Sequence, residues 1–140
     1  MPSQNDLDVI ETTVQKTYSW INDLREALGG LPRRDAYQVL RSFLHVLRDR
    51  LTVDEVAQLG AQLPMLIRGL YYEGWDPSKT PVKMKPDEFI ERFSQGLTLD
   101  EAPPEEALRA AARTLRQHIT EGEFQDVLAS LPAQLRELLV

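Results

Sequence analysis

Two histidines are the side chains best suited to bind a metal or to transfer protons in this sequence of 140 residues, which contains no cysteine. His45 lies among apolar residues, and His118 lies near the expected end of a helix. Neither belongs to a Glu-x-x-His or His-x-x-x-His pattern, the spacings that place two ligands on one face of a helix. We therefore expect no metal site and no cofactor. His45 should make a structural hydrogen bond, and His118 should interact favourably with the helix dipole.

Groups for nucleophilic catalysis are equally scarce. No thiol is present, and no serine lies in a Gly-x-Ser-x-Gly sequence. Gly29-Gly30 does not follow a strand, as phosphate-binding glycines do. Acidic pairs such as Asp54-Glu55 lie where helices should begin, and carboxylates there stabilise the helix dipole without catalysis. The sequence favours no enzyme, and a site assembled only by folding stays open as an alternative.

Three arginines are candidates for binding or for contacts between parts of the fold. Arg48 and Arg50 close the segment LRDRL at an expected helix end, where basic side chains meet unpaired carbonyls. We expect a structural role for both. Arg68 follows a Leu-Pro pair, and Arg136 repeats this placement later in the chain. The guanidinium groups of Arg68 and Arg136 could tie two halves of the protein together.

An aromatic cluster precedes a proline-rich loop. Tyr71, Tyr72 and Trp75 lie close together in the sequence, and Lys79 follows them with two further lysines. One interpretation is a hydrophobic plug at the junction of two units, and the other is a partner or ligand site rimmed with lysine. We favour the plug, and we predict that Trp75 is mostly buried against the end of the 64–72 helix, with Trp20 as a neighbour.

Apolar residues recur at helical spacing along the chain, and no segment alternates as a half-buried strand does. We predict helices over about residues 7–28, 34–51, 53–63, 64–72, 87–97 and 104–119, with an ordered loop at 73–86. Thr52 with Glu55, and Thr120 with Glu123, are typical of capping boxes, in which each side chain accepts from the other residue's amide. The apolar stripe of the first helix comprises Leu7, Ile10, Val14, Ile21, Leu24 and Leu28.

An internal repeat relates the two halves of the chain. Residues 36–72 placed on residues 104–140 without gaps give eleven identities in 37 positions. They include Thr52 with Thr120 and Pro64 with Pro132. We therefore predict one domain of eight helices, built from two pseudo-repeated four-helix units at about 5–72 and 87–140 with a junction loop at 73–86. A single unit of this size would bury too little apolar surface to be stable alone, so the two units should share a core.

Composition excludes several classes of protein. Hydrophobic residues make up 42% and charged residues 27%, as in ordinary globular proteins. The net charge of −6 argues against a nucleic-acid-binding protein. No stretch is apolar enough for a membrane span, and the first residues do not resemble a signal peptide. We expect a cytoplasmic protein, in agreement with the lack of cysteine.

The chain resembles a known family in three segments. These are QKTYSWINDLREALG, LRSFLHVLRDRLTVDEVAQLGAQLPMLIRGLYYEGWDP and, near the end, LPAQLRELL. Together they are similar to the bacterial proteins grouped as domain of unknown function family 2267, over nearly the whole chain. The resemblance implies an all-helical fold with an internal duplication, and it implies no activity.

We expect a non-enzymatic interaction or scaffold module that presents helix faces to a protein partner. The first alternative is a carrier of a small molecule or anion, with a pocket between the units near Arg68, Trp75 and the loop lysines. The second is a helical enzyme with an unrecognised site. A carrier should contain a closed cavity of several hundred cubic ångströms, whereas an interaction module should have a filled core and an exposed apolar patch.

Overall fold

Helices account for the regular secondary structure of residues 4–98 and 103–140, which the computed structural model describes, with side chains from residue 8 onward. The α-helices are α1 (Gln4–Ala27), α2 (Arg33–Arg50), α3 (Val53–Gln62), α4 (Met65–Tyr72), α5 (Pro86–Gln95), α6 (Pro104–His118), α7 (Glu121–Ala129) and α8 (Ala133–Leu139). A 3-10 helix, η1, spans Pro77–Lys79. The prediction of an all-helical fold with eight α-helices is confirmed, and these residues contain no strand. None of the helices in this part of the chain has the length and apolar character needed to cross a lipid bilayer.

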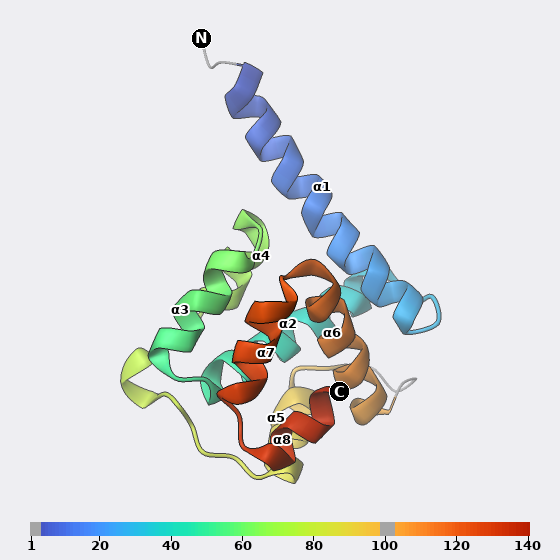
Figure 1. The fold of residues 1–140 in the computed structure, drawn as a ribbon. Coiled ribbons are helices and arrows are strands. Elements are labelled where there is room, and N and C mark those ends of the chain that lie inside the picture. Colours follow the sequence, from blue (N-terminus) through green and yellow to red (C-terminus); the bar gives the residue numbers. More distant parts are fainter. Residues whose placement is uncertain (1–3, 99–102) are drawn as a thin grey trace.

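The centre of the fold is formed by α2 and α6 (Figure 1). α2 packs against α1, α4, α5 and α6, while α6 also contacts α7 and α8. Phe43, Leu44 and Leu47 of α2 are fully buried, as are Ala111 and Leu115 of α6. The wide apolar arc of α2 therefore meets neighbours on several sides, as its sequence indicates. The halves of the chain share one apolar core.

Glycines end α1 at the position that the sequence predicts. Gly29 and Gly30 have φ angles of 79° and 95°, a conformation that glycine adopts without steric cost. The amide of Gly30 donates to the Arg25 carbonyl at 2.8 Å, and the Arg25 guanidinium donates to the Leu31 carbonyl at 2.7 Å. These bonds fix the turn that brings α2 back along α1.

Threonines cap α3 and α7 in the same manner. The Thr52 hydroxyl accepts from the Glu55 amide at 3.3 Å, and the Thr120 hydroxyl accepts from the Glu123 amide at 3.2 Å. The prediction of a complete capping box is wrong, because neither glutamate carboxylate accepts a hydrogen bond from the backbone amide of its threonine. Both glutamate side chains are instead buried, with exposed fractions of 6% and 8%. The amide of Thr120 donates to the Gln62 side chain at 3.2 Å.

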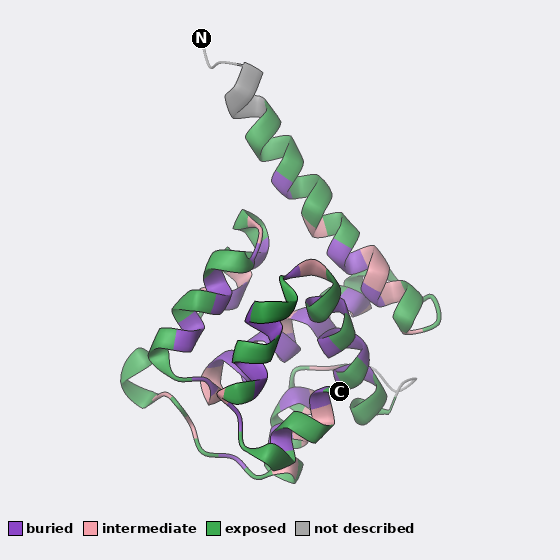
Figure 2. Ribbon diagram, in the orientation of Figure 1, coloured by how far each residue is buried: buried purple, intermediate pink, exposed green. Residues whose placement is uncertain are grey.

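The first half of α1 extends beyond the rest of the fold (Figures 1 and 2). The second half packs on α2 and α6, and buries Ile21 and Leu24. Ile10 and Val14, in the same apolar stripe, are 59% and 37% exposed. The side chain of Leu7 lies outside the described residues. The stripe that the sequence predicts is therefore covered by the chain's own core over only part of its length.

Candidate functional site

Arg48 holds the end of α4. Its side chain is buried, and its Nη1 donates to the carbonyls of Tyr71 and Glu73, both at 2.8 Å. The guanidinium also bonds the Asp49 carboxylate at 2.9 Å. Carbonyls in the last turn of a helix have no partner within the helix, and the planar arginine fork satisfies two acceptors of the α4 end at once. Its donors face the protein and not a ligand.

Arg68 makes a similar contact at the end of α3. Its Nε donates to the Gly60 carbonyl at 2.8 Å, and its Nη2 donates to the Leu63 carbonyl at 2.9 Å. Arg136 repeats this within its own half, with Nε donating to the Leu131 carbonyl at 2.8 Å. These hydrogen bonds close short local loops after each Leu-Pro pair. The expectation that Arg68 and Arg136 link the two halves has no support in these bonds.

The aromatic residues of the junction lie against one another. Tyr71 is fully buried, and its hydroxyl donates to the Val56 carbonyl at 2.9 Å. Its ring centroid is 5.0 Å from that of Tyr72, which lies 5.6 Å from the centroid of Trp75. Trp75 is half-buried, and its indole Nε1 is buried without a hydrogen-bond partner. Burial of Tyr71 raises the pKa of its phenol far above the ordinary value.

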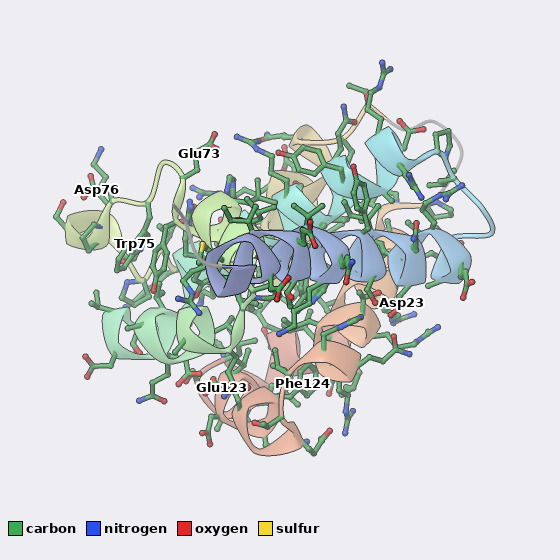
Figure 3. The ribbon with its side chains drawn as sticks, turned by 90° about the horizontal axis from the view of Figure 1, so that it is seen from above. Asp23, Glu73, Trp75, Asp76, Glu123 and Phe124 are labelled. Atoms are coloured by element: carbon green, nitrogen blue, oxygen red, sulfur yellow. The ribbon has the colours of Figure 1, made fainter. Side chains whose placement is uncertain are left out.

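Lys79 and Arg50 do not join a common binding site with this cluster. Lys79 is exposed on η1, and its Nζ lies 3.9 Å from the carboxylate of Asp76, which Figure 3 shows at the outer edge of the junction loop. Arg50 is partly buried, and its Nε has no hydrogen-bond partner. The loop returns to the core where the Val82 amide donates to the Asp49 carbonyl at 2.7 Å.

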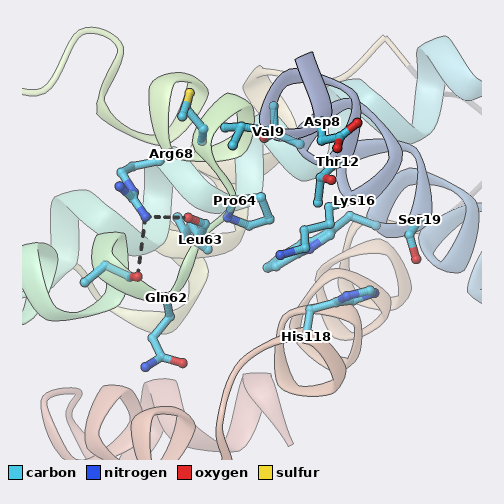
Figure 4. A pocket seen from close by; sticks show the side chains of 14 residues that line it. Asp8, Val9, Thr12, Lys16, Ser19, Gln62, Leu63, Pro64, Arg68 and His118 are labelled. Atoms are coloured by element: carbon cyan, nitrogen blue, oxygen red, sulfur yellow. Dashed lines mark hydrogen bonds between the residues drawn. The ribbon is translucent and has the colours of Figure 1, made fainter. Parts of the chain in front are cut away.

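A hollow lies between α1, the α3–α4 connection and the end of α6 (Figure 4). Its volume is about 650 Å³. Lys16, Arg68 and His118 are among its lining residues, whereas Trp75 and Lys79 are not. Because the Arg68 donors already bind backbone carbonyls, Lys16 is the cation of this hollow with no hydrogen-bond partner among the described residues. This hollow therefore differs from the pocket expected near Arg68, Trp75 and the loop lysines, since it includes Arg68 alone of these.

Both histidines make structural contacts. The Nε2 of His45 lies 2.7 Å from the Leu70 carbonyl, and burial lowers the pKa of this imidazole, so that its neutral form donates to the carbonyl. The Nε2 of His118 lies 2.6 Å from the Asp23 carboxylate, and its ring stacks on Trp20 at 4.7 Å between centroids. The second contact ties α6 to α1, and the sequence had no local signal for it. Among the described residues, no three histidine, aspartate or glutamate side chains gather as metal ligands.

An apolar groove lies on the other flank of α1. It has a volume of about 320 Å³, and Thr17 and Ile21 of α1, Tyr37 and Leu40 of α2, and Leu66 and Leu70 of α4 line it. Ile10, Val14 and Tyr18 continue the same side of α1, because residues three, four and seven positions apart share a face. We call the exposed residues Ile10, Val14, Tyr18, Tyr37 and Leu66 the α1 face; their exposed fractions run from 37% to 59%.

Charged residues lie at both ends of the α1 face. The Arg33 guanidinium lies over the Tyr18 ring, 5.0 Å from its centroid. Asp8 and Glu11 are exposed on the projecting half of α1. The projecting end of α1 therefore carries acidic side chains, and Arg33 is a basic group at the other end of the α1 face, while Glu73 also lines the groove. Sequence reasoning identified this stripe but assigned it no function, because periodicity alone does not tell which part of a face the chain covers.

Comparison with known families gives one match over most of the chain. A model of the family described as an uncharacterized conserved protein (DUF2267) matches residues 17–138. No curated protein matches the sequence. The matched segment begins within α1, so Ile10 and Val14 precede it while Tyr18, Tyr37 and Leu66 lie inside it.

Proposed function

We propose that this chain, which belongs to the uncharacterised conserved family DUF2267, is a non-enzymatic interaction module that binds an amphipathic helix of a protein partner on the α1 face. The observation that carries the proposal is the uncovered apolar stripe of α1 next to the groove between α1, α2 and α4. A helix lying in an apolar groove, with anchors spaced three, four and seven residues apart, is a common mode of recognition.

The distribution of exposed apolar side chains supports this surface over others. Nine large apolar residues of the described chain are prominently exposed, and seven of them belong to α1, the start of α2 or the start of α4. The other two, Val53 and Val140, lie at the start of α3 and at the last residue. Isolated exposed residues are normal, whereas a contiguous apolar patch is typical of an interaction site.

A carrier of a small molecule or anion is the second candidate. The hollow beside Lys16 and His118 has enough volume for a small ligand. The guanidinium group of Arg68, the strongest anion-binding group of this hollow, already donates to backbone carbonyls. If the hollow binds an anion, that anion should raise the thermal stability of the unmodified protein but not of Lys16→Ala. This result would favour a carrier over an interaction module.

We also propose that the single domain arose by internal duplication. The matched caps at Thr52 and Thr120, and the prolines before α4 and α8, support this origin. The helices α3 and α7, which the repeat equates, contact each other. A symmetric relation of the two halves would explain why equivalent residues, Glu55 and Glu123, meet in that contact.

Site-specific photo-cross-linking in the source cell tests the interaction function. A photoreactive amino acid at Leu66 should give a defined protein adduct, identified by mass spectrometry. The same amino acid at Val53, equally exposed but far from the groove, is the matched control. The adduct should weaken when Tyr37 is changed to Asp. Equal labelling at Leu66 and Val53 would show that the α1 face binds no protein.

A further inference from the structure

We infer that the helix bound on the α1 face is α1 of a second copy of this chain, in an antiparallel dimer related by a two-fold axis near Val14. This inference rests on the proposed function, because it names the partner for the same surface. The shape of α1, the order of its charges and the length of helix left uncovered favour this partner.

The geometry of α1 suits pairing with itself. Ile10, Val14 and Tyr18 are spaced by four residues and project from one side of the helix. When two such helices cross antiparallel at Val14, Ile10 of each copy lies beside Tyr18 of the other. The contact is isologous, since both copies use the same residues, and such interfaces close as dimers without growing into fibres.

The charges select the antiparallel direction. Residues 8–14 hold two acidic side chains, Asp8 and Glu11, and no basic one, giving −2. At the other end of the face, Arg33 and Arg34 are exposed on the start of α2, whereas Arg41 is paired with the Glu73 carboxylate at 3.2 Å. An antiparallel pair places the acidic start of each α1 over the basic end of its neighbour, near Arg33. A parallel pair would bring like charges together, so electrostatics disfavour it.

The uncovered part of α1 explains why a second copy fits this groove. In its own chain, the projecting half is held by the α4 start, where the Leu66 amide donates to the Thr13 hydroxyl at 3.3 Å. The antiparallel crossing lays this half along α1 of the second copy, next to that copy's groove. Ile10 and Val14 of one chain and Tyr37 and Leu66 of the other are then removed from water together. Removing these apolar side chains from water stabilises the dimer.

The first test uses the absence of natural cysteine. Val14→Cys places a thiol at the proposed two-fold axis, and mild oxidation should convert the protein to a disulfide-linked dimer at least about tenfold faster than Val53→Cys. Val53 has a similar exposed fraction, 42% against 37%, but lies at the start of α3. Light scattering of the unmodified protein should show a concentration-dependent dimer. Cross-linking of both variants at the same rate, with a monomer at all concentrations, would overturn the inference.

The second test exchanges charges across the proposed interface. Glu11→Arg or Arg33→Glu alone should weaken the dimer by about tenfold, because each contact occurs twice in a symmetric dimer. The double variant should restore the dimer. Both positions are exposed, so circular dichroism should show an unchanged helix content. The same dimer affinity in the unmodified protein, both single variants and the double variant would contradict the antiparallel arrangement.

Different results would refute the binding of a protein on the α1 face and the self-association of this chain. An adduct at Leu66 with a different protein, together with a monomeric chain, would refute self-association and keep the interaction function. An adduct with the mass of two chains that disappears in Val14→Asp supports both. Absence of a specific adduct together with a monomer refutes both.

Discussion

The carboxyl of Glu55 on α3 faces the carboxyl of Glu123 on α7, and one oxygen of each is buried without a hydrogen-bond partner. Burial, a hydrogen bond with Glu123, and the charges of Glu123 and Asp126 raise the pKa of Glu55 to about 8. This raised pKa keeps the Glu55 carboxyl protonated in the folded protein at neutral pH. Two like charges at this helix contact are thereby avoided, since desolvation and repulsion both favour the neutral form.

The protein should lose stability as the pH rises toward 8. The unfolded chain releases the Glu55 proton near the ordinary value of 4.5, whereas the folded chain keeps it to about 8. The folded state therefore binds more protons between these values, and its free energy of unfolding falls across that window. Glu55→Gln, which keeps the donor without the titration, should flatten this fall and raise stability at pH 8 by about 1–3 kcal/mol.

Urea denaturation of both proteins from pH 5 to pH 9 measures this difference. The other ionisable groups are the same in both proteins, so the difference curve reports the Glu55 carboxyl together with its coupling to Glu123. His45, whose lowered pKa acts in the acid range, is also common to both. Parallel curves would mean that Glu55 is charged in the folded protein at neutral pH.

The threonine caps should contribute equally in the two halves. Thr52→Ala and Thr120→Ala each remove the acceptor for one amide in the first turn of a helix, and each should cost about 1 kcal/mol. Thr12→Ala, at an exposed position within α1, is the control and should change the urea midpoint little. A midpoint unchanged by both cap variants would contradict the capping geometry.

Local signals explain why most of the fold could be predicted from the sequence. Gly29 and Gly30 end α1, and Thr52 and Thr120 begin α3 and α7, through interactions within a few residues of the chain. Such interactions do not depend on what packs against the helix. Apolar periodicity likewise defines the faces of α2 and α6 before any neighbour is known.

Contacts between distant segments could not be predicted in the same way. The pattern Thr52 to Glu55 is typical of a capping box whether or not a second helix covers the glutamate, so its burial against Glu123 was missed. The stripe of Ile10 and Val14 has the same spacing whether its own chain or another molecule covers it. The spacing of Arg48 and Arg68 likewise does not show that their guanidinium groups bind backbone carbonyls at the ends of α4 and α3.

Trp75 should stabilise the junction loop less than a fully buried tryptophan would. Its ring packs on Tyr72 but is half-buried, so Trp75→Ala should cost about 2 kcal/mol, below the usual loss of about 3–5 kcal/mol for buried aromatic residues. Trp75→Phe keeps a ring and removes the unpartnered indole N–H, and should cost under about 1 kcal/mol. Thermal unfolding followed by circular dichroism measures both. A Trp75→Ala protein with unchanged stability would favour a role in binding over a role in packing.

Gly60 and Tyr72 should be energetically coupled. A Cβ at Gly60 would meet the Tyr72 hydroxyl and the adjoining edge of its ring, so alanine at this position of α3 must displace the ring from Trp75. Replacing a helical glycine by alanine normally stabilises a helix by about 1 kcal/mol. Gly60→Ala should instead destabilise the protein by about 1–3 kcal/mol, the usual cost of overpacking. Gly69→Ala, on α4 with open space around its Cβ position, is the matched control and should stabilise.

The double variant separates this clash from a general intolerance of alanine in α3. In a Tyr72→Phe background the hydroxyl is absent, so Gly60→Ala should cost less by about 1 kcal/mol, a coupling typical of residues in contact. The remaining cost reflects the ring edge, which stays close to the new methyl group. Urea unfolding of the four proteins in this cycle measures the coupling. Equal costs of Gly60→Ala with tyrosine and with phenylalanine at position 72 would show that the hydroxyl does not restrict this position, and that another contact of α3 requires the glycine.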